Sequence, residues 1–141
     1  MLLVFKMPFR IVLLCAILGL YHGPGQSQVQ QQNPYSDWKS IEVTASAYNS
    51  LVGQGVGNPS ITAWGDTLNP GMKSVAISRD LLQLGMDYGT PVKIKGLDGV
   101  FIVNDKMHPR WEKKIDIYMG VNRERALEWG SRKVEICFPE N

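Results

Sequence analysis

Cysteine and histidine are scarce in this sequence, which has two of each in 141 residues. Cys15 lies in an apolar run near the start that we expect to be removed, so Cys137 would have no partner within the chain. The folded part must then be held together by its core and not by disulfides. His108 would be the remaining histidine, and we interpret it as a solvated loop residue. Because zinc sites need clustered histidines or cysteines, the sequence predicts no metal.

An excess of one charge is also lacking once the first segment is set aside. The formal net charge of +2 comes from 15 basic and 13 acidic residues. Lys6 and Arg10 belong to the first segment, and without them the basic residues equal the acidic ones. A domain that is close to neutral has no general electrostatic attraction to phosphate backbones. The sequence therefore predicts that nucleic acid is not a partner.

The sequence has a single long hydrophobic run, residues 11–21 (IVLLCAILGLY). It follows Lys6 and Arg10 and precedes small residues and a proline, which is the layout of a secretory signal peptide. The run is roughly half as long as a membrane helix requires, so membrane contact is expected only through the uncleaved signal. Cys15 lies inside the run and follows a leucine, which argues against a lipoprotein. We expect a signal peptide over 1–25 and export to the periplasm or cell envelope.

Apolar residues are also sparse in the segment that follows, residues 26–39, which is rich in glutamine. Such a composition is typical of a flexible linker. The rest of the chain, 40–139, is a domain of roughly one hundred residues, which is enough for one core. We expect it to be a monomer.

Alternation of apolar and polar residues dominates this domain and predicts strands at 41–48, 92–96 and 132–138. The apolar runs at 74–78 and 99–103 suit buried strands, and Asp98-Gly99 is a hairpin-turn signal. Two short helices are expected, one ending at Gly85 and one that begins after Asn122 as N-cap and ends at Gly130. Many short strands with few helices predict an all-β fold, a compact six-stranded barrel. The residues expected inside it are Ile94, Ile102, Ile115, Ile117, Val134 and Ile136.

Asp105 and Asp116 are the candidate working groups. In KIDIYM, strand alternation places Ile115 and Ile117 in the core and Asp116 on the opposite face. The same count puts Asp105 on one face with Val103. A partly buried carboxyl group has a raised pKa and can donate a proton to a leaving oxygen, as cleavage of a glycosidic bond requires. The alternative is that both acids only accept hydrogen bonds from backbone amides.

Three segments, VAISRDLLQLG, VNDKM…KKIDIYMG and ALEWGSRKVEI, together resemble the three-aspartate (3D) domain. That domain occurs in cell-wall lytic enzymes such as the membrane-bound lytic transglycosylase A family, and in stationary-phase survival proteins. The resemblance covers about 43–136 and implies a double-psi β-barrel. It implies that Asp116 is the catalytic acid and base and that Asp105 is the family's second aspartate. Thr62 and Gly65 match a Thr-x-x-Gly turn at the glycan groove.

Two positions depart from the pattern of that family. Ser78 stands where the family has an aspartate, and Asp80 is two residues away. The segment KMHPRW replaces a glycine turn and puts Trp111 at the position of a lysine. Ser78 and Trp111 remain candidate substrate-binding residues, with Trp111 forming either a sugar-stacking rim beside basic residues or a cap on the barrel.

The leading functional interpretation is an exported lytic transglycosylase. It would cleave peptidoglycan glycan strands between N-acetylmuramic acid and N-acetylglucosamine, leave a 1,6-anhydro product and need no cofactor. The second interpretation is an expansin-like barrel that binds glycan without cutting it, and the third is an envelope protein that binds another protein. The missing acid favours the second interpretation. The retained Asp116 and its spacing from Asp105 favour the first.

Overall fold

The structure, a computed structural model, describes residues 33–52 and 57–140. The predicted signal peptide and the first part of the predicted linker lie outside these residues. Residues 33–38, from the end of that linker, form turns, and the amine of Lys93 lies 4.6 Å from the centre of the Tyr35 ring. This short segment therefore packs on the barrel. Within the described residues, no helix is long and apolar enough to cross a membrane.

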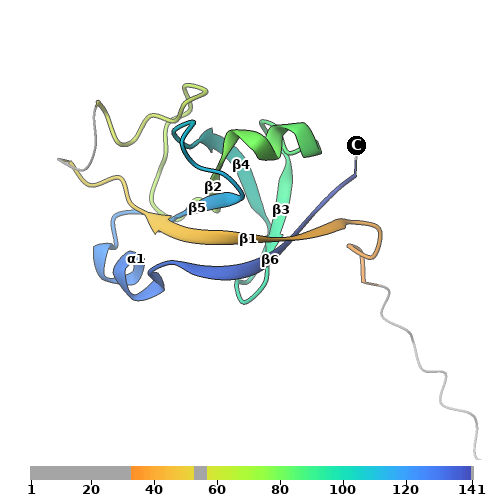
Figure 1. Ribbon diagram of the computed structural model, residues 1–141. Coiled ribbons are helices and arrows are strands. Elements are labelled where there is room, and N and C mark those ends of the chain that lie inside the picture. Colours follow the sequence, from red (N-terminus) through yellow and green to blue (C-terminus); the bar gives the residue numbers. More distant parts are fainter. Residues whose placement is uncertain (1–32, 53–56, 141) are drawn as a thin grey trace, which may run out of the picture. The chain divides into compact units, whose positions relative to one another are not determined.

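Six strands close into a barrel (Figure 1). They are β1 (Lys39–Tyr48), β2 (Ser74–Ile77), β3 (Pro91–Ile94), β4 (Phe101–Lys106), β5 (Lys114–Tyr118) and β6 (Arg132–Phe138). Their order around the barrel is β1-β5-β2-β4-β3-β6. β1 pairs in parallel with β5 and β2 in parallel with β4, while the other neighbours are antiparallel. The two parallel pairs interlock, because β5 lies between β1 and β2. The predicted six-stranded double-psi β-barrel is confirmed.

Both predicted helices are present. A 3-10 helix, η1 (Arg79–Leu84), follows β2 and ends at Gly85, whose φ of 90° is in the left-handed region that glycine adopts without strain. The α-helix α1 (Arg123–Trp129) begins after Asn122, whose side-chain oxygen accepts the backbone N–H of Arg125 at 2.9 Å. That hydrogen bond satisfies one of the free donors of the first turn.

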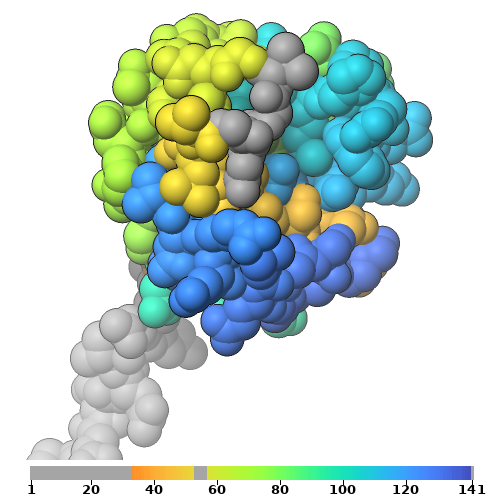
Figure 2. All heavy atoms as spheres, turned by 90° about the vertical axis from the view of Figure 1, so that its left-hand side faces the viewer, coloured from red at the N-terminus to blue at the C-terminus, as the bar shows by residue number. Residues whose placement is uncertain are grey.

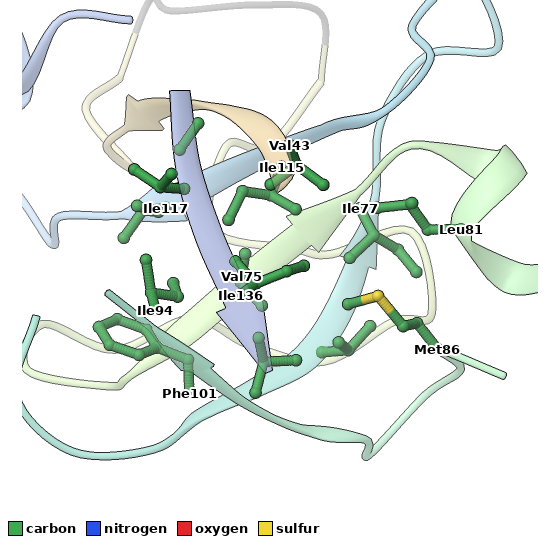
Figure 3. Close-up of a cluster of buried hydrophobic side chains, with 14 of the residues drawn as sticks. Val43, Val75, Ile77, Leu81, Met86, Ile94, Phe101, Ile115, Ile117 and Ile136 are labelled. Carbon is green, nitrogen blue, oxygen red and sulfur yellow. The ribbon is translucent and has the colours of Figure 1, made fainter. Parts of the chain in front are cut away.

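The barrel interior is filled with aliphatic side chains from all six strands (Figure 3). Figure 3 shows Leu81 of η1 and Met86 beside Ile77 at one end of this cluster. Ile115 and Ile117 of β5 have no exposed surface, and Val134, Ile136 and Phe138 of β6 are also buried. Alternation thus predicted the inward face of these two strands correctly.

One predicted core residue is wrong. Ile102 is 41% exposed, and its neighbours Phe101 and Val103 point inward instead. The run GVFIV is apolar throughout, so its sequence has no polar residue to mark the outer face. The pairing with β3, which sets Val92 opposite Phe101, decides which side faces in.

A bulge in β4 changes the direction of the residues that follow it. Val103 pairs with Val75 of β2, whereas the next residue of β2, Ala76, pairs with Asp105, so Asn104 is extra. A bulge of this kind shifts the alternation by one residue. The expectation that Asp105 shares a face with Val103 is therefore wrong, since Val103 is inside and Asp105 is outside.

Ile117→Ala should lower the free energy of unfolding by about 2–5 kcal/mol, because it removes a fully buried side chain and leaves a cavity. Denaturant unfolding of the full chain measures the loss. Ile102→Ala removes the same atoms from an exposed position and should cost well below that range. A loss under about 0.5 kcal/mol at Ile117 would contradict its place in the core.

Candidate functional site

Four residues on adjacent strands form one row across the barrel, here called the site row. Ser46 of β1 pairs with Asp116 of β5, and Asp116 pairs with Ala76 of β2. Ala76 pairs in turn with Asp105 of β4, because of the bulge at Asn104. Neighbouring strands are about 4.8 Å apart, so the two aspartates lie two strand spacings from each other with a small side chain between them.

The site row opens into a cleft with a volume of about 180 Å³. Figure 2 looks onto this end of the domain, where residues 57–70 (yellow-green) and 105–113 (cyan-blue) stand on opposite sides. Because Ala76 has the smallest side chain of the row, it leaves the space between the two acids open. The cleft is lined by Tyr48, Ala76, Asp105, Lys106, Met107, His108, Trp111 and Asp116.

Asp116 has a raised pKa. Burial raises its pKa above the ordinary aspartate range, and the nearby charge of Asp105 adds to this. The hydroxyl of Ser46, which donates to Asp116 Oδ1 at 2.9 Å, and the charge of Lys114 oppose the shift. No described residue forms a hydrogen bond with Oδ2, so this oxygen is available to a ligand.

Asp105 accepts hydrogen bonds from two backbone amides. Its Oδ1 accepts the backbone N–H of Ala63 at 2.7 Å and that of Lys106 at 2.8 Å. The first bond ties the 61–66 turn, which is 42 residues away in sequence, to the edge of the cleft. Asp105 therefore holds a wall in place as well as contributing negative charge beside Asp116.

Tyr48 stands beside both acids at the end of β1. Its ring is 5.4 Å from that of Tyr118, whose hydroxyl forms a 2.7 Å hydrogen bond with Ser50. Burial and the charge of Asp105 raise the pKa of the Tyr48 phenol, so it stays protonated. The hydroxyl oxygen itself is buried and has no hydrogen-bond partner among the described residues.

Both walls of the cleft carry a tryptophan covered by a cation. The amine of Lys106 lies 4.4 Å from the centre of the Trp64 ring, which also contacts Tyr88. On the other wall the amine of Lys114 lies 3.9 Å from the centre of the Trp111 ring, and the Arg110 guanidinium lies 4.8 Å from it. Cations held against aromatic faces gain electrostatic stabilisation and are fixed in position. Trp111 thus positions charge at the rim as well as lining it.

Thr62 and Gly65 build the turn that Asp105 holds. Thr62 is 5% exposed, and its hydroxyl accepts the backbone N–H of Asp66 at 3.0 Å. Gly65 has a φ of 93°, which a side chain would strain, and its N–H donates to the carbonyl of Thr62. In this conformation both residues shape the wall and neither lines the cleft.

Ser78 does not lie in the cleft. It has no exposed surface, and its Oγ accepts the backbone N–H of Lys114 at 2.9 Å. Asp80 also faces elsewhere, because its carboxylate accepts the backbone N–H of Lys113 at 2.9 Å. Contact of Ser78 with substrate is therefore corrected to a structural role, in which it joins the end of β2 to the start of β5.

His108 lines the cleft and is exposed, and its Nδ1 accepts the backbone N–H of Arg110 at 3.2 Å. No group of three or more histidine, cysteine, aspartate or glutamate side chains in the described part of the chain could hold a metal ion. Cys137 is half-buried and free.

Sequence reasoning missed Ser46, Tyr48, Lys106 and Tyr88. Ser46 and Tyr48 share the outer face of β1, which alternation alone could have shown. Their proximity to Asp116 depends on the parallel pairing of β1 with β5, and no local pattern in the sequence reports such a pairing.

No protein-family model and no curated protein matches the chain. Among solved structures, it is similar to the crystal structure of an apo expansin from Clavibacter michiganensis, at 19% sequence identity and a TM-score of 0.47. That match covers 71% of this chain and 50% of the expansin, so this chain spans about half of that protein. Such a similarity transfers neither activity nor ligand. The resemblance to the 3D domain stays a prediction.

Ser46→Ala should raise the pKa of Asp116 further, because the hydroxyl favours the ionised carboxylate. Since the folded-state pKa is already raised, the free energy of unfolding falls as pH rises from the ordinary aspartate range through that pKa. The variant should lose more stability over this range and up to higher pH. Carboxyl NMR titration and unfolding at several pH values measure both effects.

Ser40→Ala, an exposed serine on the same strand, should change neither quantity. A lowered Asp116 pKa in Ser46→Ala would mean that the hydroxyl does not stabilise the carboxylate.

Proposed function

We propose that this protein is exported and binds the glycan strands of the bacterial cell wall in the cleft. The site row is the observation that carries the proposal. Sugars present hydroxyl groups around a ring with apolar faces. A site for them needs a few polar groups at close range with aromatic side chains beside them. Asp116 Oδ2 and the amine of Lys106 meet that need beside the small side chain of Ala76.

Binding without cleavage fits the way in which the acids are used. Asp105 gives one oxygen to two backbone amides, and Ser78 is buried where the resembling family has an acid. Asp116 keeps an oxygen free of hydrogen bonds from described residues, and burial raises its pKa. Two-carboxylate hydrolysis, which needs a second acid to activate water or attack the sugar, has no support here.

Ala76→Leu tests whether the cleft is the binding site. A leucine side chain would fill the space between the two acids without removing any polar group. Retention of the full chain on purified peptidoglycan should fall at least about tenfold, a loss of about 1.4 kcal/mol in binding free energy. Pull-down at several peptidoglycan concentrations measures it.

The matched control is Gln83→Leu, which adds the same side chain to an exposed position outside the cleft. It should leave retention unchanged. Equal retention of Ala76→Leu and the unsubstituted protein, with both folded, would show that glycan binds elsewhere.

A second candidate function, lytic transglycosylation, is favoured by the raised pKa of Asp116. A protonated Asp116 would give its proton to the glycosidic oxygen as the bond to the muramyl C1 breaks. The carboxylate would then accept the proton of the muramyl 6-hydroxyl, whose oxygen forms the new bond to C1. One acid performs both steps, and the product is a 1,6-anhydro sugar with no water consumed.

Asp116→Asn separates chemistry from binding. If Asp116 is the general acid, release of anhydromuropeptides should fall by about 10²–10⁴-fold, since an amide fills the same space but delivers no proton. Mass spectrometry of the soluble products measures the rate, and Asp37→Asn, at an exposed position outside the cleft, is the control. Equal rates from Asp116→Asn and the unsubstituted protein would contradict the catalytic role. Binding alone predicts no anhydro product from either.

A further inference from the structure

A second pocket, of about 310 Å³, shares no lining residue with the cleft. We call it the α1 pocket. It lies where residues 71–73 before β2, residues 96–98 between β3 and β4, and residues 118–120 at the end of β5 meet α1. Its volume is in the range of small-molecule sites.

Part of the lining of the α1 pocket is apolar. Phe101, Tyr118 and Met119 are each less than a tenth exposed, and half-buried Leu97 lies beside them. An apolar group placed here would leave water and contact side chains that are already fixed by the core.

Lys73 is held at the edge of this surface. Its amine donates to the carbonyl of Asp98 at 2.6 Å and lies 6.0 Å from the centre of the Phe101 ring. An ammonium has three donors, so two remain for a ligand. Gly99 permits this placement, since a Cβ there would lie 2.1 Å from the Lys73 amine.

Arg125 lines the same pocket from α1. The two ion pairs in the described part of the chain are Lys95–Glu135 and Lys133–Glu42, so neither cation of the α1 pocket is neutralised by an acid. The guanidinium has five donors and pairs with carboxylates through two parallel hydrogen bonds. The cap that Asn122 forms on the backbone of Arg125 fixes the helix that carries it.

We propose that the α1 pocket binds the carboxylate end of a short peptide or N-acylated amino acid. The carboxylate would lie between Lys73 and Arg125, and the apolar side chain would rest on Phe101 and Met119. Asp98 also lines the pocket, and its negative charge disfavours further negative charge, so a singly charged ligand fits better than a phosphate.

The proposal for the α1 pocket does not depend on the proposed glycan function, because its ligand contains no sugar. If the cleft does bind cell-wall glycan, the peptide chains attached to that glycan are ligands of the required class. The two sites are linked through aromatic contact, since Tyr118 of the α1 pocket lies against Tyr48 of the cleft.

The test is an NMR titration of the full chain with N-acetyl-alanyl-alanine, in its L,L and D,D forms, and with the C-terminal amide of each. At least one carboxylate form should shift the backbone signals of Lys73, Leu97, Met119 and Gly120 and bind at least tenfold more tightly than its amide. Arg125→Gln should weaken the carboxylate at least tenfold, and so should Lys73→Gln. Arg123→Gln, an exposed arginine on the same helix outside the pocket, should not.

The proposal is overturned if neither carboxylate form binds, if carboxylate and amide bind equally, or if Arg123→Gln weakens binding as much as Arg125→Gln. Ala76→Leu should leave dipeptide binding unchanged. A protein that fails to bind peptidoglycan but binds the dipeptide would reject the glycan function and keep this site.

Discussion

The bulge at Asn104 is the constraint on which the site depends. Without it, alternation from Val103 would turn Asp105 into the barrel, where an unpaired carboxylate is costly to bury. With it, Asp105 faces outward and is level with Asp116 across Ala76. The side chain of the extra residue, Asn104, is buried and accepts a hydrogen bond from Ser74 of the adjoining strand. One inserted residue thus sets both the core and the polar row above it.

The two aspartates of the site row have different roles. Asp105 accepts two backbone amides and thereby holds the 61–66 turn, with Trp64, against the cleft. Asp116 keeps an oxygen free of hydrogen bonds from described residues, and burial of its carboxyl group raises its pKa. β5 therefore fixes the position of Asp116, while Asp105 fixes the 61–66 turn. This arrangement favours the proposed binding of sugar hydroxyl groups over the proposed cleavage.

Local patterns in the sequence predicted the six strands, both helices and the inward face of β5 and β6. They failed at Ile102, because the run around it is apolar throughout and does not show which residues face outward. They failed at Asp105, because the bulge at Asn104 shifts the alternation by one residue. Ser46 lies beside Asp116 because β1 pairs with β5. Lys106 is positioned by its contact with Trp64 of the 61–66 turn. Ser78 was matched to a site position by resemblance, but it is buried and its hydroxyl accepts a hydrogen bond from the backbone N–H of Lys114.

If glycan binds at the site row, a crystal structure of the full chain with a soluble muropeptide fragment should show the fragment there. We expect a sugar ring above Ala76, with a hydroxyl oxygen within hydrogen-bond distance of Asp116 Oδ2 and the ring between the walls that carry Trp64 and Trp111. A fragment bound on another face of the barrel, with the site row free, would contradict it.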